Sequence, residues 1–137
     1  IDQSGSMSDE DVKDGVTLIL DLLANKAAEL DVVNFDVEID IDSFKKNIKK
    51  SEAFKWTRTR CGGTDFDCVR KYVAESENKG RWSGIIIYTD GFAPKMGQIF
   101  GAKVLWLITK TGDANLEAAR PGDLVVKMGE RRLERKR

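Results

Sequence analysis

Three turns of this sequence carry small oxygen-bearing side chains that could together hold a metal ion. They are Asp2-Gln3-Ser4-Gly5-Ser6, Gly62-Gly63-Thr64-Asp65 and Thr89-Asp90-Gly91. The chain contains no histidine, and Cys61 and Cys68 are too few soft ligands for a structural zinc site. Carboxylate and hydroxyl oxygens favour a hard divalent cation. Mg²⁺, which keeps several of its bound waters, is the first choice.

Each of these turns is expected at the carboxyl end of a parallel strand. The segments 84–88 and 104–108 are unbroken apolar runs of strand length, a pattern typical of central parallel strands that helices cover on both faces. In open α/β sheets, the carboxyl ends of the strands form the edge where ligands bind. The sequence therefore predicts that the three turns meet at one edge of a sheet.

A long helix is expected directly after the first turn. Ser8 is a suitable N-cap, and the acidic residues that follow it suit the positive end of a helix dipole. Apolar residues then recur at spacings of three and four, which predicts one buried stripe on a helix of about 20 residues that starts near Asp9. The stripe consists of Val12, Val16, Ile19, Leu20, Leu23, Ala27 and Leu30.

The remaining patterns complete an α/β chain. Strands are predicted over 32–35 and over 37–42, where apolar and acidic residues alternate as on an edge strand. We expect a lysine-rich turn over 45–50, a further candidate strand over 53–57, and a helix from Phe66 to Lys79-Gly80. A short helix over 113–120 and a strand over 124–127 precede a charged basic tail, residues 130–137, for which a frayed helix is the simplest interpretation.

We therefore predict a single domain over residues 1–129. Its fold class is α/β, with a doubly wound, mostly parallel sheet, one antiparallel edge strand and helices on both faces. No internal repeat or low-complexity linker divides the chain.

The three turns together resemble the metal-ion-dependent adhesion site (MIDAS) of von Willebrand factor A-type (VWA) domains, which have a Rossmann-like fold. That site has Asp-x-Ser-x-Ser, then Thr after glycines, then Asp after a hydrophobic strand, and all its positions match here. The resemblance implies that Ser4, Ser6 and Thr64 supply hydroxyl oxygens, while Asp2 and Asp90 orient bound waters or contact the ion. The ion is Mg²⁺, with Mn²⁺ and Ca²⁺ as alternatives, and a partner's Asp or Glu fills the open position.

The resemblance runs from Asp2 to about Ile108 and is closest to intracellular bacterial and phage VWA-like proteins. Some of these accompany MoxR-type AAA+ ATPases, which makes such an ATPase a candidate partner. A cytoplasmic protein is expected, because no apolar run approaches the roughly 20 residues of a membrane span. The 23 basic and 23 acidic residues cancel, so neither a nucleic acid nor a membrane is the expected partner.

The sequence departs from the VWA pattern at its start. VWA domains normally carry an apolar strand before the first Asp, whereas only Ile1 precedes Asp2 here. A parallel sheet without its middle strand would leave backbone groups unpaired and the core open. We therefore expect that a segment upstream of residue 1, or one from elsewhere, supplies the first central strand.

Three alternatives stay open at this point. The first is a metal-dependent phosphatase of the HAD type with Asp2 as nucleophile. Such enzymes usually have a second carboxylate two residues later as the general acid, and Ser4 occupies that position here. The second is a structural subunit with an empty site. The third concerns the basic, aromatic-bearing stretch 44–60, which could touch nucleic acid or an acidic partner, although a solvated turn with inward-packed aromatics is the simpler explanation.

Catalysis is not expected, because without histidine no Ser-His-Asp arrangement can form within the chain. Cys61 and Cys68 fit reduced thiols, and a bridge between them stays open. Trp82 and Trp106 are expected in the core rather than as ligand-stacking residues.

Overall fold

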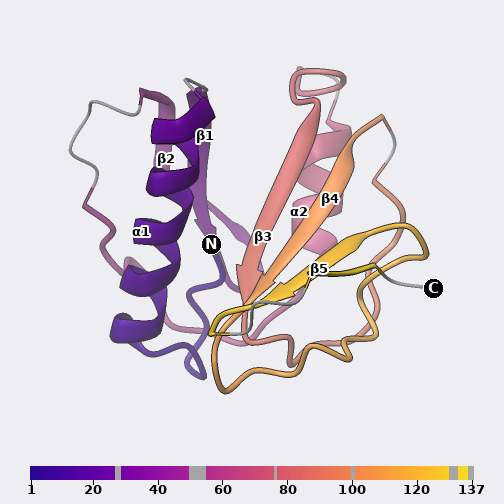
Figure 1. The fold of residues 1–137 in the computed structure, drawn as a ribbon. Helices are drawn as coiled ribbons and strands as arrows, with labels where there is room; N and C mark the ends of the chain where they lie inside the picture. The colour runs from indigo at the N-terminus through magenta and orange to yellow at the C-terminus, as the bar shows by residue number, and fades with distance from the viewer. Residues whose placement is uncertain (27–28, 50–54, 76, 100, 130–132, 136–137) are drawn as a thin grey trace.

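The computed structural model describes all residues except 27–28, 50–54, 76, 100, 130–132 and 136–137. Neither helix in this part of the chain is long and apolar enough to cross a membrane. In chain order the elements are α1 (Asp9–Lys26), β1 (Glu29–Phe35), β2 (Ile39–Lys49), α2 (Asp67–Ala74), β3 (Gly84–Thr89), β4 (Lys103–Ile108), β5 (Leu124–Lys127) and β6 (Leu133–Arg135) (Figure 1).

The strands form two sheets. β1 and β2 make an antiparallel hairpin, in which Phe35 pairs with Ile39. The strands β3, β4 and β5 are parallel neighbours, and β6 adds an antiparallel edge strand to β5. The apolar runs of β3 and β4 fit parallel strands that are covered on both faces.

The two helices cover opposite faces of the parallel sheet. Side chains alternate between the faces along a strand, so neighbours in β3 belong to different core clusters. Ile87 lies in the cluster that contains Val69 of α2, and Tyr88 lies in the cluster that contains Val16 of α1. The prediction of helices on both faces of the sheet is therefore confirmed for the parallel strands.

The helix α1 begins at Asp9, as predicted, and Ser8 Oγ accepts a hydrogen bond from the N–H of Asp11 at 3.1 Å. Its buried face contains Gly15. A Cβ atom at that position would lie 2.1 Å from the ring of Tyr88 in β3. Gly15 therefore lets α1 lie directly against this ring, whose hydroxyl donates to the carbonyl oxygen of Asp11.

The two sheets meet at the carboxyl ends of β1 and β3, where the segment 1–3 lies between them. Asp2 forms a parallel bridge with Phe35, and its N–H donates to the carbonyl oxygen of Tyr88 at 2.9 Å. A cavity of about 360 Å³ lies between β1 and β3 next to this segment. Its lining includes Ile1, Val16, Ile19, Val33, Val73 and Ile85. Figure 1 places the chain's N-terminus between these two strands.

The α/β class is confirmed, but the single doubly wound sheet is not. The hairpin β1–β2 lies apart from the four-stranded sheet, and β3 is an edge strand of that sheet instead of a central one. The physical reason is that no strand in the described part of the chain runs between β1 and β3. The prediction of a single antiparallel edge strand is also wrong, because β2 and β6 are both antiparallel to their neighbours.

Several predicted elements end elsewhere. The lysine-rich segment expected as a turn continues β2 to Lys49, because Lys49 pairs with Glu29 across the hairpin. The second helix ends at Ala74, before the predicted Lys79. Residues 113–120 form no helix. There the Asp113 carboxylate accepts the N–H of Asn115, a local bond that competes with helical pairing.

The remaining expectations fall partly on residues that are not described. Of the candidate strand 53–57, residues 53–54 lie outside the described part, and 55–57 are not in a strand. The frayed helix predicted for the tail is wrong at 133–135, which form β6. The other tail residues from 130 to 137 lie outside the description. The strand predicted over 124–127 is confirmed as β5.

We predict that Gly15→Ala destabilises the fold by about 1–3 kcal/mol, because the added methyl group must displace the Tyr88 ring. In an ordinary helix interior the same change stabilises by roughly 0.5–1 kcal/mol, so the sign itself is diagnostic. The measurement is the free energy of unfolding in urea. The control is Thr17→Ala on the exposed face of α1. A Gly15→Ala protein as stable as the parent would contradict the close approach.

The cavity between β1 and β3 also yields a prediction. A four-residue extension of Val-Leu-Val-Val before Ile1 should raise the free energy of unfolding by about 2 kcal/mol or more, because its side chains would enter the apolar cavity between β1 and β3. A Gly-Ser-Gly-Ser extension of the same length is the control. Equal stability of the two extended proteins would count against a strand site there.

Candidate functional site

The two predicted carboxylates lie buried at one edge of the fold. Asp2 has no exposed surface, and Asp90, which directly follows β3, is 4% exposed. The backbone N–H of Asp2 donates to the carbonyl oxygen of Tyr88, two residues before Asp90. The turn that contains Asp2 and the turn that contains Asp90 are thus neighbours, as the sequence predicts.

Both carboxylate oxygens of Asp2 accept hydrogen bonds. Oδ1 accepts the N–H of Ser4 at 2.8 Å, and Oδ2 accepts the hydroxyl of Thr89 at 2.7 Å. Burial raises the pKa of Asp2 above its ordinary value, the negative charge of Asp90 raises it further, and the bonds from Thr89 and Ser4 act in the opposite direction. Keeping Asp2 ionised in this buried position therefore has an electrostatic cost, which a cation beside it would reduce.

Asp90 has one satisfied and one unsatisfied oxygen. Its Oδ1 accepts the N–H of Phe92 at 3.2 Å. Its Oδ2 is buried and has no hydrogen-bond partner among the described residues. Leaving a buried polar group unpaired costs roughly 1–3 kcal/mol, and more for a charged group, so native proteins keep few of them. A cation, or a water bound to one, would satisfy this oxygen.

The predicted hydroxyl ligands differ in how closely the structure brings them to these carboxylates. Ser4 is buried, and its Oγ lies 3.3 Å from Oγ of the exposed Ser6. The segment of Thr64 is tied to the same loop, because the carbonyl oxygen of Gly62 accepts the N–H of Gly5 at 3.0 Å. Within the described part of the chain, the hydroxyl of Thr64 bonds to none of the other four candidates. The structure thus ties the segment of Thr64 to the loop through a backbone bond.

The turn after β3 is fixed by a close backbone approach. Gly91 has φ +84°, and a Cβ atom there would lie 2.4 Å from the carbonyl oxygen of Asp113. The N–H of Asp113 donates to the carbonyl oxygen of Asp90 at 2.8 Å. Gly91 is therefore required both by its left-handed backbone and by the space, and the approach fixes the backbone from which the Asp90 carboxylate projects.

The donor set limits which ions the site suits. Among the described residues, no group of three or more His, Cys, Asp or Glu side chains is placed to hold a metal ion. The candidate site has two carboxylates, with hydroxyls supplying its other donors. Such a set fits a hard cation that keeps part of its water shell, and it does not fit a fully protein-ligated transition metal.

Sequence reasoning did not single out two residues that shape this site. Thr89 donates to Asp2, and Gln3 is fully buried with its Oε1 accepting the N–H of Thr59 at 3.0 Å and that of Arg60 at 3.3 Å. The signal for Thr89 is its position at the end of an apolar strand, one residue before Asp90. Gln3 occupies a variable position of its motif, so its type carried no such signal.

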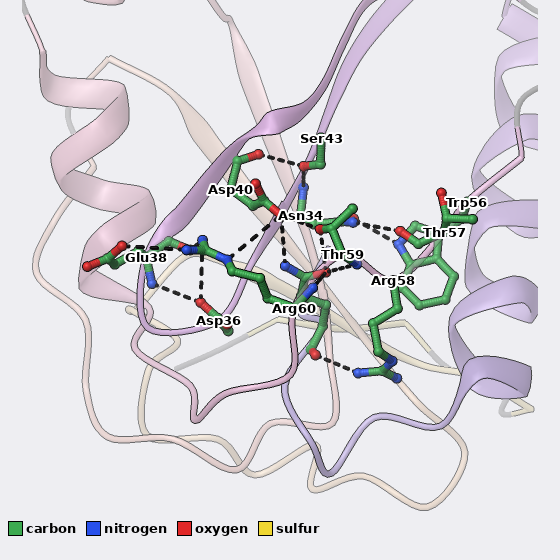
Figure 2. A network of polar contacts seen from close by, with 11 residues as sticks. Asn34, Asp36, Glu38, Asp40, Ser43, Trp56, Thr57, Arg58, Thr59 and Arg60 are labelled. Carbon is green, nitrogen blue, oxygen red and sulfur yellow. Dashed lines mark hydrogen bonds and ion pairs between the residues drawn. The ribbon is translucent and has the colours of Figure 1, made fainter.

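The basic stretch 44–60 is more than a solvated turn at its end. Arg60 lies among Asp36, Glu38 and Asp40, with nitrogen to oxygen distances of 3.7, 3.6 and 3.8 Å (Figure 2). The aromatic side chain of Trp56 is buried, as expected. The acidic residues around Arg60 come from the β1–β2 hairpin, so the charge of this arginine is met within the chain.

Both cysteines are free thiols, so the bridge left open by the sequence is not present. Cys61 is exposed, and Cys68 is half-buried. Burial raises the pKa of Cys68 to about 12, with the negative charges of Asp65 and Asp36 adding to the effect. Of the predicted core tryptophans, Trp106 is fully buried and Trp82 is half-buried.

A family model described as VWA-like domain (DUF2201) matches residues 1–128, nearly the whole chain. The chain belongs to this VWA-like family. Comparisons of this VWA-like domain with curated proteins and with solved structures gave no match. The resemblance found in the three turns is thus confirmed at the level of the family, while the metal site itself stays a prediction.

We predict that the two thiols of this VWA-like domain react differently with iodoacetamide at neutral pH. Cys61 should be alkylated readily because it is exposed, whereas Cys68 should stay unmodified in the folded protein because its thiolate is scarce and half-buried. Peptide mass spectrometry measures both sites, with urea-unfolded protein as the control in which both react. Equal labelling in the folded protein would contradict the burial of Cys68.

Proposed function

We propose that this VWA-like domain is a protein-binding module that holds one divalent cation, Mg²⁺, between the Asp2 loop and Asp90. The observation that carries the proposal is the buried Oδ2 of Asp90, which has no partner among the described residues. It lies beside a second carboxylate, Asp2, whose pKa is raised by burial and by the charge of Asp90. A cation would bind the unpartnered oxygen of Asp90 and also offset the negative charge at Asp2.

In this proposal the ligands are those of a MIDAS. Ser4, Ser6 and Thr64 supply hydroxyl oxygens, and Asp2 and Asp90 hold bound waters or contact the ion. Mn²⁺ or Ca²⁺ would fit the same oxygen donors with different geometry. Two carboxylates balance the doubly charged ion without surplus, so the remaining position attracts an outside anion, namely an Asp or Glu of a partner protein.

The surroundings of the site favour binding over catalysis. Phe92 is 58% exposed two residues after Asp90, and Val37 is 51% exposed and packs near Gly63 of the second turn. Exposed apolar residues beside a polar centre suit a protein interface, where aromatic side chains are enriched. Both oxygens of Asp2 already accept hydrogen bonds, which makes it a poor nucleophile for the alternative HAD-type phosphatase.

The partner class follows from this chemistry, and its identity is a further proposal. A MoxR-type AAA+ ATPase that presents an acidic side chain is the candidate we propose, in the cytoplasm. Two free cysteines without a bridge fit such a reducing compartment. We assign the domain no enzymatic activity, since the chain lacks histidine as a general base.

The experiment is a calorimetric titration of the chain with Mg²⁺, repeated with Mn²⁺ and Ca²⁺. We predict uptake by the parent protein and a loss of at least tenfold in affinity for Asp90→Asn. The matched control is Asp113→Asn, since Asp113 is an exposed carboxylate whose backbone bonds to Asp90. Bound Mg²⁺ should also stabilise the fold by ~2.7 kcal/mol at a hundredfold excess over its dissociation constant.

The partner step needs its own measurement, a pull-down with and without EDTA by the parent and by Asp2→Ala. Capture that EDTA and Asp2→Ala both abolish supports the proposal, and capture that survives both overturns it. No cation uptake by the parent would favour a structural subunit with an empty site. Mg²⁺-dependent phosphatase turnover that is lost in Asp2→Asn would favour the HAD alternative.

A further inference from the structure

The segment Trp56–Arg60, called the strap below, links the candidate loop to the hairpin. Its first half is fixed to β1, because Trp56 Nε1 donates to Asn34 Oδ1 at 2.8 Å. In return Asn34 Nδ2 donates to the carbonyl oxygen of Thr57 at 3.0 Å. Figure 2 shows these side chains in one network with Arg58 and Arg60. The strap therefore reaches the loop from a rigid base.

Arg58 of the strap binds three backbone carbonyls of the loop that contains the two serine ligands. Its Nη1 donates to the carbonyl oxygens of Gln3 at 2.6 Å and Ser4 at 3.1 Å, and its Nη2 donates to that of Met7. The Arg58 side chain is 21% exposed, and its Nε lies 3.1 Å from Asp9 Oδ1. One planar guanidinium thus spans the loop from before Ser4 to after Ser6.

Gln3 binds the strap in the opposite direction. Its Oε1 accepts the N–H groups of Thr59 and Arg60, and also the Thr59 hydroxyl at 3.0 Å. Its Nε2 lies 3.4 Å from Asp40 Oδ2, to which it donates. The strap side chain thus holds the loop backbone, and the loop side chain holds the strap backbone. We call this reciprocal pair, Arg58 and Gln3, the latch.

We propose that Arg58 is a positioning residue of the cation site, and that the latch sets the geometry of the loop 3–7 before a cation binds. This inference rests on the proposed function. Without Arg58, three loop carbonyls lose a shared donor, and Ser4 and Ser6 lose the constraint that keeps their hydroxyls together. The strap also continues into Gly62, which bonds to Gly5, so the latch holds the segment of Thr64 beside the same loop.

A positioning role and a purely electrostatic role of Arg58 predict opposite changes in cation affinity when this residue is replaced. A guanidinium near the ion repels it, so an effect of charge alone would let Arg58→Gln bind cations more tightly. An outer contact that orients ligands has the reverse effect, since its loss commonly weakens metal affinity by 10–100-fold. The ion pair with Asp9 offsets part of the positive charge, which favours the positioning role.

The test compares Arg58→Gln and Arg58→Lys with Arg81→Gln. Arg81 is a matched control, because it lies 4.9 Å over the Trp82 ring and 3.6 Å from Asp31, as Arg58 lies over Trp56 and beside Asp9. Arg81 precedes β3, at the strand end opposite to the candidate site. The readouts are the Mg²⁺ dissociation constant by calorimetry and, in EDTA, hydrogen exchange of the Gly5 and Met7 amides.

We predict a 10–100-fold larger Mg²⁺ dissociation constant for Arg58→Gln and an unchanged one for Arg81→Gln. Arg58→Lys keeps the charge without the planar fork, so its dissociation constant should rise by a smaller factor. In EDTA, exchange at Gly5 and Met7 should speed up in Arg58→Gln and not in Arg81→Gln. Should Arg58→Gln not fold, the comparison of Arg58→Lys with Arg81→Gln decides by the same readouts.

The outcomes separate the two proposals. If the parent takes up no cation, the proposed function fails, and the exchange rates alone decide whether the latch sets the loop. If the parent binds Mg²⁺ and Arg58→Gln binds it equally well or more tightly, the positioning role is overturned while the cation site stands. Unchanged exchange at Gly5 and Met7 in Arg58→Gln also overturns the latch.

Discussion

The backbone pairing of residues 1–3 with two different strands is the constraint on which the rest of the structure depends. Asp2 forms a parallel bridge with Phe35 at the end of β1, and its N–H bonds to Tyr88 at the end of β3. These bonds bring the hairpin, the parallel sheet and the first turn to one edge. The buried carboxylates, the loop with its two serines and the strap all take their positions from this junction.

The junction also explains why the site concentrates negative charge. The ends of neighbouring segments deliver Asp2 and Asp90 together, and burial removes the water that would otherwise screen them. The protein meets the charge of Asp2 with hydrogen bonds from Ser4 and Thr89, and it leaves one oxygen of Asp90 without a partner in the described residues. Structural carboxylates are usually fully bonded, so this asymmetry is the feature on which the proposed cation site rests.

Local patterns in the sequence predicted the parts of the fold that depend on local signals. Ser8 and the apolar spacing predicted the start of α1, and the apolar runs predicted β3 and β4. The turns of Asp2 and Asp90 were expected to be adjacent, and they are. The helix expected over 113–120 did not form. The Asp113 carboxylate bonds locally to the N–H of Asn115, and the N–H of Asp113 bonds to Asp90, a tertiary contact that helical spacing does not reveal.

Long-range contacts account for most of what the sequence did not predict. The strap looked like a basic, solvated stretch, since nothing in its composition shows that Arg58 binds carbonyls 51 to 55 residues earlier in the chain. Gln3 and Thr89 act through partners 56 and 87 residues away. The division into two sheets was hidden for the same reason, because strand order is decided by pairing partners and not by the strands' own patterns.

The facing edges of β1 and β3 affect how the domain behaves in solution. Apart from the bonds to residues 1–3 at one end, each strand pairs on one side only within the described residues. Unpaired strand edges recruit extended segments from neighbouring molecules, and this is a common route to aggregation. Here the edges flank an apolar cavity, so a foreign strand would gain both backbone bonds and burial. A neighbouring copy that added a strand to this chain would therefore do so most favourably in that gap.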